Sequence, residues 1–165
     1  MNIHKFSKTK FERSVLIDIP LDEAYHYAAT ADGITKWFIG KADYTAPDGT
    51  SRKGDELIQK GDSYDFDWLY KDFRVKGEVL EANSRDYVKF TFGDTATFDI
   101  KLSELDDRTL FTLTQESNPD NPMNEEGHIN CYVCWTLFVL NLKSVAENGI
   151  DLREWDYDMD GLVNW

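Results

Sequence analysis

Two cysteines and a histidine stand close together in residues 127–149, GHINCYVCWTLFVLNLKSVAENG, which the sequence predicts to be part of a long helix. Thiols spaced Cys-x-x-Cys carry out redox chemistry at a helix N-terminus, where the helix dipole lowers the pKa of a thiol. Cys131 and Cys134 instead lie two or three turns inside the predicted helix, among bulky apolar neighbours. We therefore interpret them as core residues, with a redox pair as the open alternative.

A zinc site is the second alternative for the same segment. His128, Cys131 and Cys134 follow one another at intervals of three residues, so successive side chains turn by about 60° around a helix. Zinc in proteins takes four ligands in a tetrahedral arrangement, and no fourth ligand is apparent. We therefore predict no metal and no cofactor.

Among the histidines, His128 is the best single candidate for acid–base chemistry. His4 lies in an N-terminal arm and His26 on a short predicted helix, whereas His128 begins the long helix, where it could face the mouth of a cavity. A neutral histidine in such a place is most often a structural hydrogen-bond partner, and an acid–base role is the alternative. The chain contains no nucleophile elbow, no Walker loop and no dinucleotide-binding glycine motif. The sequence therefore predicts that the protein is not an enzyme; in the alternative, His128 acts with Tyr132 or Tyr70.

A partial calcium motif stands near the C-terminus. Residues 156–161, DYDMDG, match the first half of a calcium-binding loop. The bidentate glutamate of a complete loop would fall after Trp165. We therefore interpret residues 154–165 as an acidic, aromatic tail, with a weak or partner-completed cation site as the alternative.

Charge and composition limit the classes of partner. The chain has 165 residues, enough for one domain with a sizeable core. It carries 31 acidic against 18 basic residues, a net charge of −13, which repels phosphate backbones and anionic lipid headgroups. We expect neither nucleic acid nor a membrane as partner, but a neutral ligand or a basic protein surface. Because there is no apolar N-terminal signal and no run of about 18 apolar residues, the expected location is the cytoplasm.

Alternation of apolar residues with period two predicts that most of the chain forms strands. Residues 11–19 are typical of a half-buried strand, and short helices are predicted over 21–30 and 31–40. Further strands are predicted at 55–60, 65–70, 73–82, 86–92, 96–102 and 108–116. The linkers between them are short and turn-like, which indicates antiparallel neighbours.

The long helix is predicted to start near Pro122 and to end at Glu147 or Asn148, with Gly149 as its terminator. Its apolar residues cover two faces, so we expect it to be buried on most sides. The second of these faces holds Val133, Leu137 and Leu140. The predicted fold class is α+β: a curved antiparallel sheet of six or seven strands wrapped around a long C-terminal helix, with two short helices after the first strand.

Three segments resemble a known family. Residues 12–38, ERSVLIDIPLDEAYHYAATADGITKWF, look like its opening strand and helix. Residues 73–92, FRVKGEVLEANSRDYVKFTF, look like its central strands, and residues 128–153, HINCYVCWTLFVLNLKSVAENGIDLR, look like its closing helix. The family is that of the activator of heat-shock-protein-90 ATPase homologues, a branch of the START-related helix-grip superfamily. Phe92 and Cys134 depart from its pattern, because they stand where tryptophan and glycine are usual.

The resemblance covers residues 11–153 and implies the domain organisation. An N-terminal arm occupies residues 1–10, a helix-grip domain residues 11–153 and the tail residues 154–165. The resemblance also implies a cavity between the concave sheet and the long helix, which in this superfamily takes apolar or amphipathic small molecules. Because the family includes chaperone cofactors, a chaperone-type partner and a role in stress responses are expected as well.

The residues expected to line this cavity are mostly aromatic side chains of the predicted sheet and helix. They are Trp37, Phe38, Trp68, Tyr70, Phe73, Phe90, Phe92, Phe98, His128, Cys131, Trp135 and Phe138. The expected function is non-catalytic binding of a small apolar or amphipathic ligand, of a chaperone-type regulatory partner, or of both. Two alternatives remain: a cavity enzyme of the cyclase or hydrolase sort with His128 as acid–base group, and a structural or interaction domain whose aromatic residues fill the core.

Overall fold

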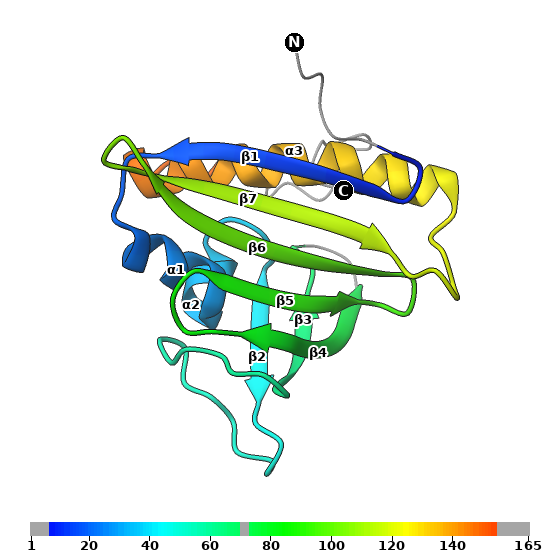
Figure 1. The fold of residues 1–165 in the computed structure, drawn as a ribbon. Coiled ribbons are helices and arrows are strands. Elements are labelled where there is room, and N and C mark those ends of the chain that lie inside the picture. The colour runs from blue at the N-terminus through cyan, green and yellow to red at the C-terminus, as the bar shows by residue number, and fades with distance from the viewer. Residues whose placement is uncertain (1–6, 70–72, 155–165) are drawn as a thin grey trace.

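The computed structural model describes residues 7–69 and 73–154, so Tyr70, His4 and the calcium-like motif lie outside the described residues. It contains a 7-stranded antiparallel sheet, two short helices and one long helix (Figure 1). The strands are β1 (Lys10–Ile17), β2 (Lys41–Thr45), β3 (Ser63–Asp67), β4 (Arg74–Ala82), β5 (Tyr87–Phe92), β6 (Ala96–Leu105) and β7 (Arg108–Ser117). The helices are α1 (Leu21–Ala29), α2 (Ala31–Thr35) and α3 (Glu125–Asn148). The predicted α+β fold is confirmed.

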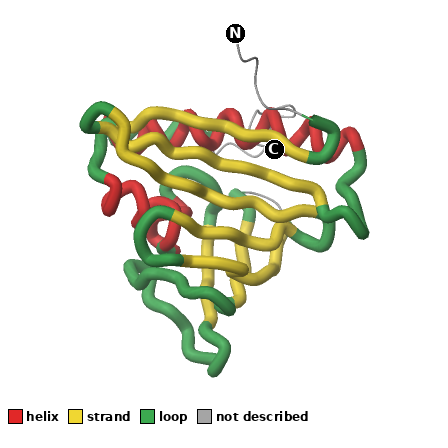
Figure 2. Tube along the Cα trace, viewed as in Figure 1, coloured by secondary structure: helices red, strands yellow, loops and turns green. Residues whose placement is uncertain are grey.

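The sheet has the order β1-β7-β6-β5-β4-β3-β2, so consecutive strands from β2 to β7 are neighbours and β1 joins β7 at the far edge. Asp106 and Asp107 both have a positive φ in the turn between β6 and β7, as tight hairpin turns require. The pairing register of β4 with β5 shifts between Val79 and Glu81, and such irregularities bend a strand. The strand direction turns from β1 to β2 (Figure 2), and the sheet curves around one face of α3.

Two parts of the strand prediction are wrong. Residues 55–60 form no strand but lie in the loop between β2 and β3. In that loop Ile58 is buried and donates its backbone N–H to Ala29 O at the end of α1, instead of to a neighbouring strand. The edge strand β2 has no counterpart in the prediction, because its apolar alternation consists of only Ala42 and Tyr44.

The two short helices close one end of the sheet, and Thr30 joins them. Its Oγ1 donates to His26 O at 2.7 Å and accepts from the backbone N–H of Gly33 at 2.9 Å, so it also caps α2. A Cβ on Gly33 would lie 2.0 Å from His26 O, so only glycine fits between the helices. The chain therefore turns sharply and delivers Trp37 and Phe38 beneath α3.

The helix α3 begins three residues later than Pro122. Its cap is Asn124, whose Oδ1 accepts the backbone N–H of Gly127 at 2.7 Å. Glu125 and Glu126 follow directly and place two acids at the positive end of the helix dipole. The predicted terminator is confirmed, because Gly149 has a φ of 69° and caps the helix in the left-handed conformation.

The outer face of α3 contradicts the expectation of burial on most sides. Ile129, Val133 and Leu140 are each about half exposed, because α3 packs on the sheet with one face only, along β1 (Figure 1). By length and composition alone α3 is also apolar enough to cross a membrane, a test that core helices of soluble proteins pass as well. We call Ile129, Val133 and Leu140 the outer ridge.

Candidate functional site

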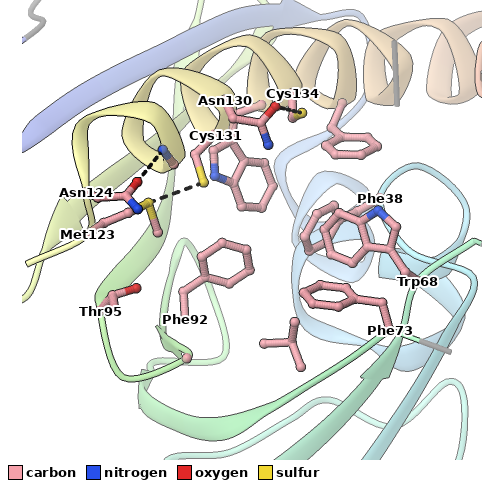
Figure 3. A pocket seen from close by; sticks show the side chains of 15 residues that line it. Phe38, Trp68, Phe73, Phe92, Thr95, Met123, Asn124, Asn130, Cys131 and Cys134 are labelled. Atoms are coloured by element: carbon pink, nitrogen blue, oxygen red, sulfur yellow. Dashed lines mark hydrogen bonds between the residues drawn. The ribbon is translucent and has the colours of Figure 1, made fainter. Parts of the chain in front are cut away.

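A cavity of about 650 Å³ lies between α3 and the curved sheet (Figure 3). Its lining comes from the turn after α2, from β4 and β5, from the β3–β4 and β5–β6 connections, and from α3 with the residues just before it. The lining residues are Phe38, Trp68, Phe73, Val75, Phe92, Gly93, Thr95, Met123, Asn124, Gly127, Asn130, Cys131, Cys134, Trp135 and Phe138. Within the described part of the chain, none of these side chains carries a charge.

The turn after α2 holds the inner end of the cavity in place. The side-chain amide of Asn141, a buried residue of α3, donates to Trp37 O at 3.0 Å. The indole N–H of Trp37 donates to Tyr27 O at 2.9 Å. The next residue, Phe38, then lies with its ring centroid 4.4 Å from that of Trp135 and 5.1 Å from that of Phe138.

Trp135 is the central aromatic residue of the helix wall. Its indole N–H donates to Oε1 of Gln115, a fully buried residue of β7, at 2.7 Å. Its ring also contacts Phe98 and Phe92, at centroid distances of 5.1 Å and 5.9 Å. A buried indole needs such an acceptor, so the Gln115 contact fixes the orientation of the ring.

The opposite end of the cavity is open to solvent. Phe73 is 55% exposed, and its ring lies edge-on to Trp68 at a centroid distance of 5.8 Å. On the helix side Asn124 and Asn130 are exposed residues that still line the cavity. A small molecule therefore has a route to the aromatic interior.

The two cysteines and Met123 form a sulfur-rich part of the lining. The Cys131 thiol donates to Met123 Sδ at 3.7 Å, and the Cys134 thiol to Asn130 Oδ1 at 3.8 Å (Figure 3). Burial raises the pKa of the Cys131 thiol and raises the pKa of Cys134 to about 11. Both thiols are therefore protonated near neutral pH, which disfavours redox chemistry. Among the described residues no cluster of three histidine, cysteine or acidic side chains could hold a metal ion.

The structure brings together many of the residues named from the sequence. Phe38, Trp68, Phe73, Phe92, Cys131, Trp135 and Phe138 line the cavity. Trp37, Phe90 and Phe98 do not: they are buried behind the lining, where the rings of Phe90 and Phe98 stack at 4.6 Å. Phe90 and Phe98 lie at buried positions of β5 and β6, and Trp37 lies in the turn after α2. The ring of the lining residue Trp135 packs against Trp37 and Phe98, at centroid distances of 6.4 Å and 5.1 Å.

His128 does not line the cavity, contrary to the expectation that it could act there as an acid–base group. The residue is buried between α3 and the start of β1, with Nε2 2.9 Å from Ser7 O and its ring centroid 5.2 Å from that of Phe11. It therefore faces β1, not the cavity, and we read it as a structural residue.

The uncharged polar wall is the part that sequence reasoning missed. It comprises Thr95 together with Asn124, Gly127, Asn130 and Cys134 of the α3 region. A signal for the helix residues was present, because they recur three or four positions apart with Cys131 and so share one helical face. The prediction followed mostly aromatic residues and named only Cys131 from this face.

Comparison with known proteins finds one family model and several solved structures that this chain resembles. A family model described as Activator of Hsp90 ATPase homolog 1-like protein matches residues 18–147. A crystal structure from Staphylococcus saprophyticus is similar with a TM-score of 0.69 and 14% identity, over 87% of this chain and 96% of that one. The solution structure of the Aha1 dimer from Colwellia psychrerythraea is similar with a TM-score of 0.63 and 18% identity, over 85% of this chain and 97% of that one.

A third similar structure is DynU16, described as a putative protein in the dynemicin biosynthetic locus. Its TM-score is 0.68 at 18% identity, over 89% of this chain and 50% of that one. At these identities the solved structures establish the fold and not the activity. Comparison with curated proteins finds no match.

Proposed function

We propose, from the premise that this chain belongs to the Activator of Hsp90 ATPase homolog 1-like family, that it is a non-catalytic protein that binds a small apolar ligand between α3 and the sheet. The observation that carries the proposal is the open, aromatic-lined cavity of about 650 Å³. That volume is within the range of pockets that hold drug-sized ligands, roughly 300–1,000 Å³. Similar architecture in a protein of a biosynthetic locus is compatible with a small-molecule ligand.

The chemistry of the lining supports binding over catalysis. An enzyme of this shape needs at least two polar groups that converge on the substrate and can exchange protons. The lining offers Thr95, Asn124 and Asn130, which do not titrate, and two thiols whose pKa is raised by burial. We therefore do not propose a reaction.

Thermal unfolding tests the proposal directly. The purified protein is heated with a sterol, a flavonoid, a fatty acid or an apolar dye, while Trp68 and Trp135 report by fluorescence. A ligand at 100 times its dissociation constant adds about 2.7 kcal/mol to the free energy of unfolding and raises the midpoint by several degrees. Cys131→Phe fills the cavity and should remove the shift, whereas Val133→Phe, on the outer ridge of the same helix, should keep it. Absence of any shift, or an equal shift in Cys131→Phe, would refute the proposal.

The outer ridge supports a second candidate function, binding of a protein partner. Residues 129–142 of α3 contain no acidic or basic residue, although the chain is rich in charge, and the ridge exposes Ile129, Val133 and Leu140. Exposed apolar surface rimmed by polar residues marks interaction sites. Because the net charge is −13, we propose a partner with an apolar groove bordered by basic side chains, since opposite charge speeds association.

A second copy of the chain is the competing occupant of the ridge. The similar protein from Colwellia psychrerythraea is described as a dimer, so the molar mass in solution is measured first. A basic amphipathic peptide of leucine and lysine then serves as the probe. Binding should be lost in Val133→Asp and kept in Ser103→Asp, which adds the same charge at an exposed site on β6. A dimer that Val133→Asp dissociates would overturn the partner proposal in favour of self-association.

A further inference from the structure

The described lining of the cavity is uncharged in a protein that is otherwise densely charged. The chain carries 18 basic and 31 acidic residues, yet the described lining contains none of them. In particular, the residues of the aromatic wall that the structure describes include no lysine or arginine that could pair with an anionic ligand. A ligand of the cavity must therefore suit an uncharged lining.

An anionic ligand is disfavoured by this partition for two reasons. Transfer of a carboxylate from water to a low-dielectric site without a cationic partner is costly, and the group responds by taking up a proton. The net charge of −13 adds a longer-range repulsion. Salt screens the second effect but leaves the first, because the Debye length falls from about 10 Å at 0.1 M to about 3 Å at 1 M.

The polar wall offers hydrogen-bond donors. The Oδ1 atoms of Asn124 and Asn130 are already engaged, since they accept from the Gly127 backbone N–H and from the Cys134 thiol. The remaining polar atom of each amide is the donor Nδ2. Figure 3 shows the amide nitrogen of Asn130 on the cavity side of its side chain. A ligand that brings an acceptor to this place can therefore take a hydrogen bond from the Asn130 amide.

The apolar walls favour a ring system. Phe38 and Trp135 lie 4.4 Å apart at an interplanar angle of 32°, and Phe92 is tilted by 47° to Trp135. Trp68 and Phe73 meet edge to face on the other side. Aromatic faces and edges pair best with the edges and faces of another aromatic ring, so a flat ring system matches this lining better than a flexible chain.

Resting on the ligand-binding function proposed above, we infer that the cavity selects an uncharged aromatic ligand whose neutral acceptor, a ketone, ester or ether oxygen, is bound by the Asn130 side-chain amide. Fatty acids and other carboxylates are discriminated against because the described residues of the lining supply no cation. Asn130 is thus the residue that sets specificity at the mouth, while the rings supply most of the affinity.

A matched pair of fluorescent probes tests this inference. Prodan is an uncharged naphthyl ketone whose emission reports the polarity around its carbonyl, and dimethylaminonaphthoate carries a carboxylate on the same ring. We expect prodan to bind at least tenfold more tightly, at about 0.1 M and about 1 M salt alike. Preference for prodan that vanishes at the higher salt, or equal affinities throughout, would overturn the inference while leaving the ligand-binding function intact. If neither probe binds and the wider ligand panel also gives no shift, the function itself fails.

Asn130→Asp tests the hydrogen bond separately. The variant keeps the size of the side chain and an acceptor for the Cys134 thiol, but it replaces the amide donor by a carboxylate. Loss of one hydrogen bond predicts that prodan affinity falls roughly three- to tenfold, with a blue shift of the emission. The control is Asn148→Asp, an equal charge change at the exposed end of the same helix, which should leave the affinity unchanged. Unchanged prodan affinity in Asn130→Asp would show that the Asn130 amide does not bind the ligand.

Discussion

At the scale of single residues, Gln115 is a buried amide whose oxygen accepts the indole N–H of Trp135 at 2.7 Å. In Gln115→Leu the indole donor stays buried without its acceptor, which we expect to lower the free energy of unfolding by about 1–3 kcal/mol. Urea unfolding measures this change. The double variant Gln115→Leu with Trp135→Phe removes both partners and should cost less than the sum of the two single changes. Strict additivity would show that the bond does not hold the ring.

The thiols give a prediction that depends on pH. Burial raises the pKa of Cys134 from an ordinary value of 9.0 to about 11, so at pH 8 the folded protein holds about a hundredfold less thiolate there than an ordinary thiol does. Alkylation of Cys134 by iodoacetamide should be slower in the folded protein by at least that factor, with the denatured chain as control. Equal rates would contradict the burial that the structure shows.

The same shift affects stability at alkaline pH. Because the folded state holds the proton of Cys134 more tightly than the unfolded state, stability is unaffected below the unfolded pKa and falls as pH rises from about 9 towards about 11. Cys134→Ala should remove this contribution and flatten the decline. An unchanged slope in the variant would assign the alkaline loss to other groups.

At the scale of elements, a C-terminal segment locks the turn that carries Phe38. Arg153 is buried and donates to Thr35 O, Lys36 O and Ile39 O at 3.0–3.1 Å, and so satisfies carbonyls at the end of α2 that lack helical partners. Asp151 accepts from Arg153 and from the Asn141 amide. This network ties α3 to α2 at the inner end of the cavity.

Removal of the guanidinium should destabilise the protein and loosen the cavity. Arg153→Met leaves the carbonyls at the end of α2 without their donor and removes the guanidinium that pairs with Asp151, and loss of one partner from a buried ion pair costs about 3–5 kcal/mol. We expect the lower end, because Asp151 is partly exposed. The measurement is chemical unfolding, with ligand affinity as a second readout. Arg74→Met is the control, since its exposed pair with Asp67 is worth about 0–1 kcal/mol. An equal decrease in the free energy of unfolding in the two variants would show that Arg153 does not hold this turn in place.

The same elements show how far the sequence carries. Strands β4 to β7 follow directly from alternation, because each has a buried and an exposed face in a sheet with one wet side. The same rule fails for the loop at 55–60, because Leu57 and Ile58 are typical of a strand. There the buried carboxylate of Asp62 accepts from Arg52 and stabilises a loop instead. Likewise the aromatic wall is predictable from composition, whereas the uncharged polar wall depends on which face of α3 meets the cavity.

At the scale of the whole molecule, the net charge of −13 is the dominant electrostatic feature. Like charges on a compact body repel one another and lower its stability relative to the expanded chain. Several ion pairs, such as Lys8–Glu125 and Lys10–Glu116, are exposed. Such pairs contribute little to the free energy of unfolding, so the loss of stability when salt screens them is small. Screening should therefore stabilise the protein on balance, and we expect the unfolding midpoint to rise by a few degrees between about 0.02 M and about 0.5 M NaCl.

The identity of the cation separates general screening from a specific site. Sodium and potassium chloride at equal ionic strength should give equal midpoints, because screening depends on charge and concentration alone. Calcium at matched ionic strength should also agree, because the expected rise comes from screening and not from a cation bound at the calcium-like motif of residues 156–161. An additional rise with calcium that Asp158→Asn abolishes would instead establish a cation site in the tail. A midpoint that falls with salt would mean that ion pairs, and not the net charge, dominate the stability of this acidic domain.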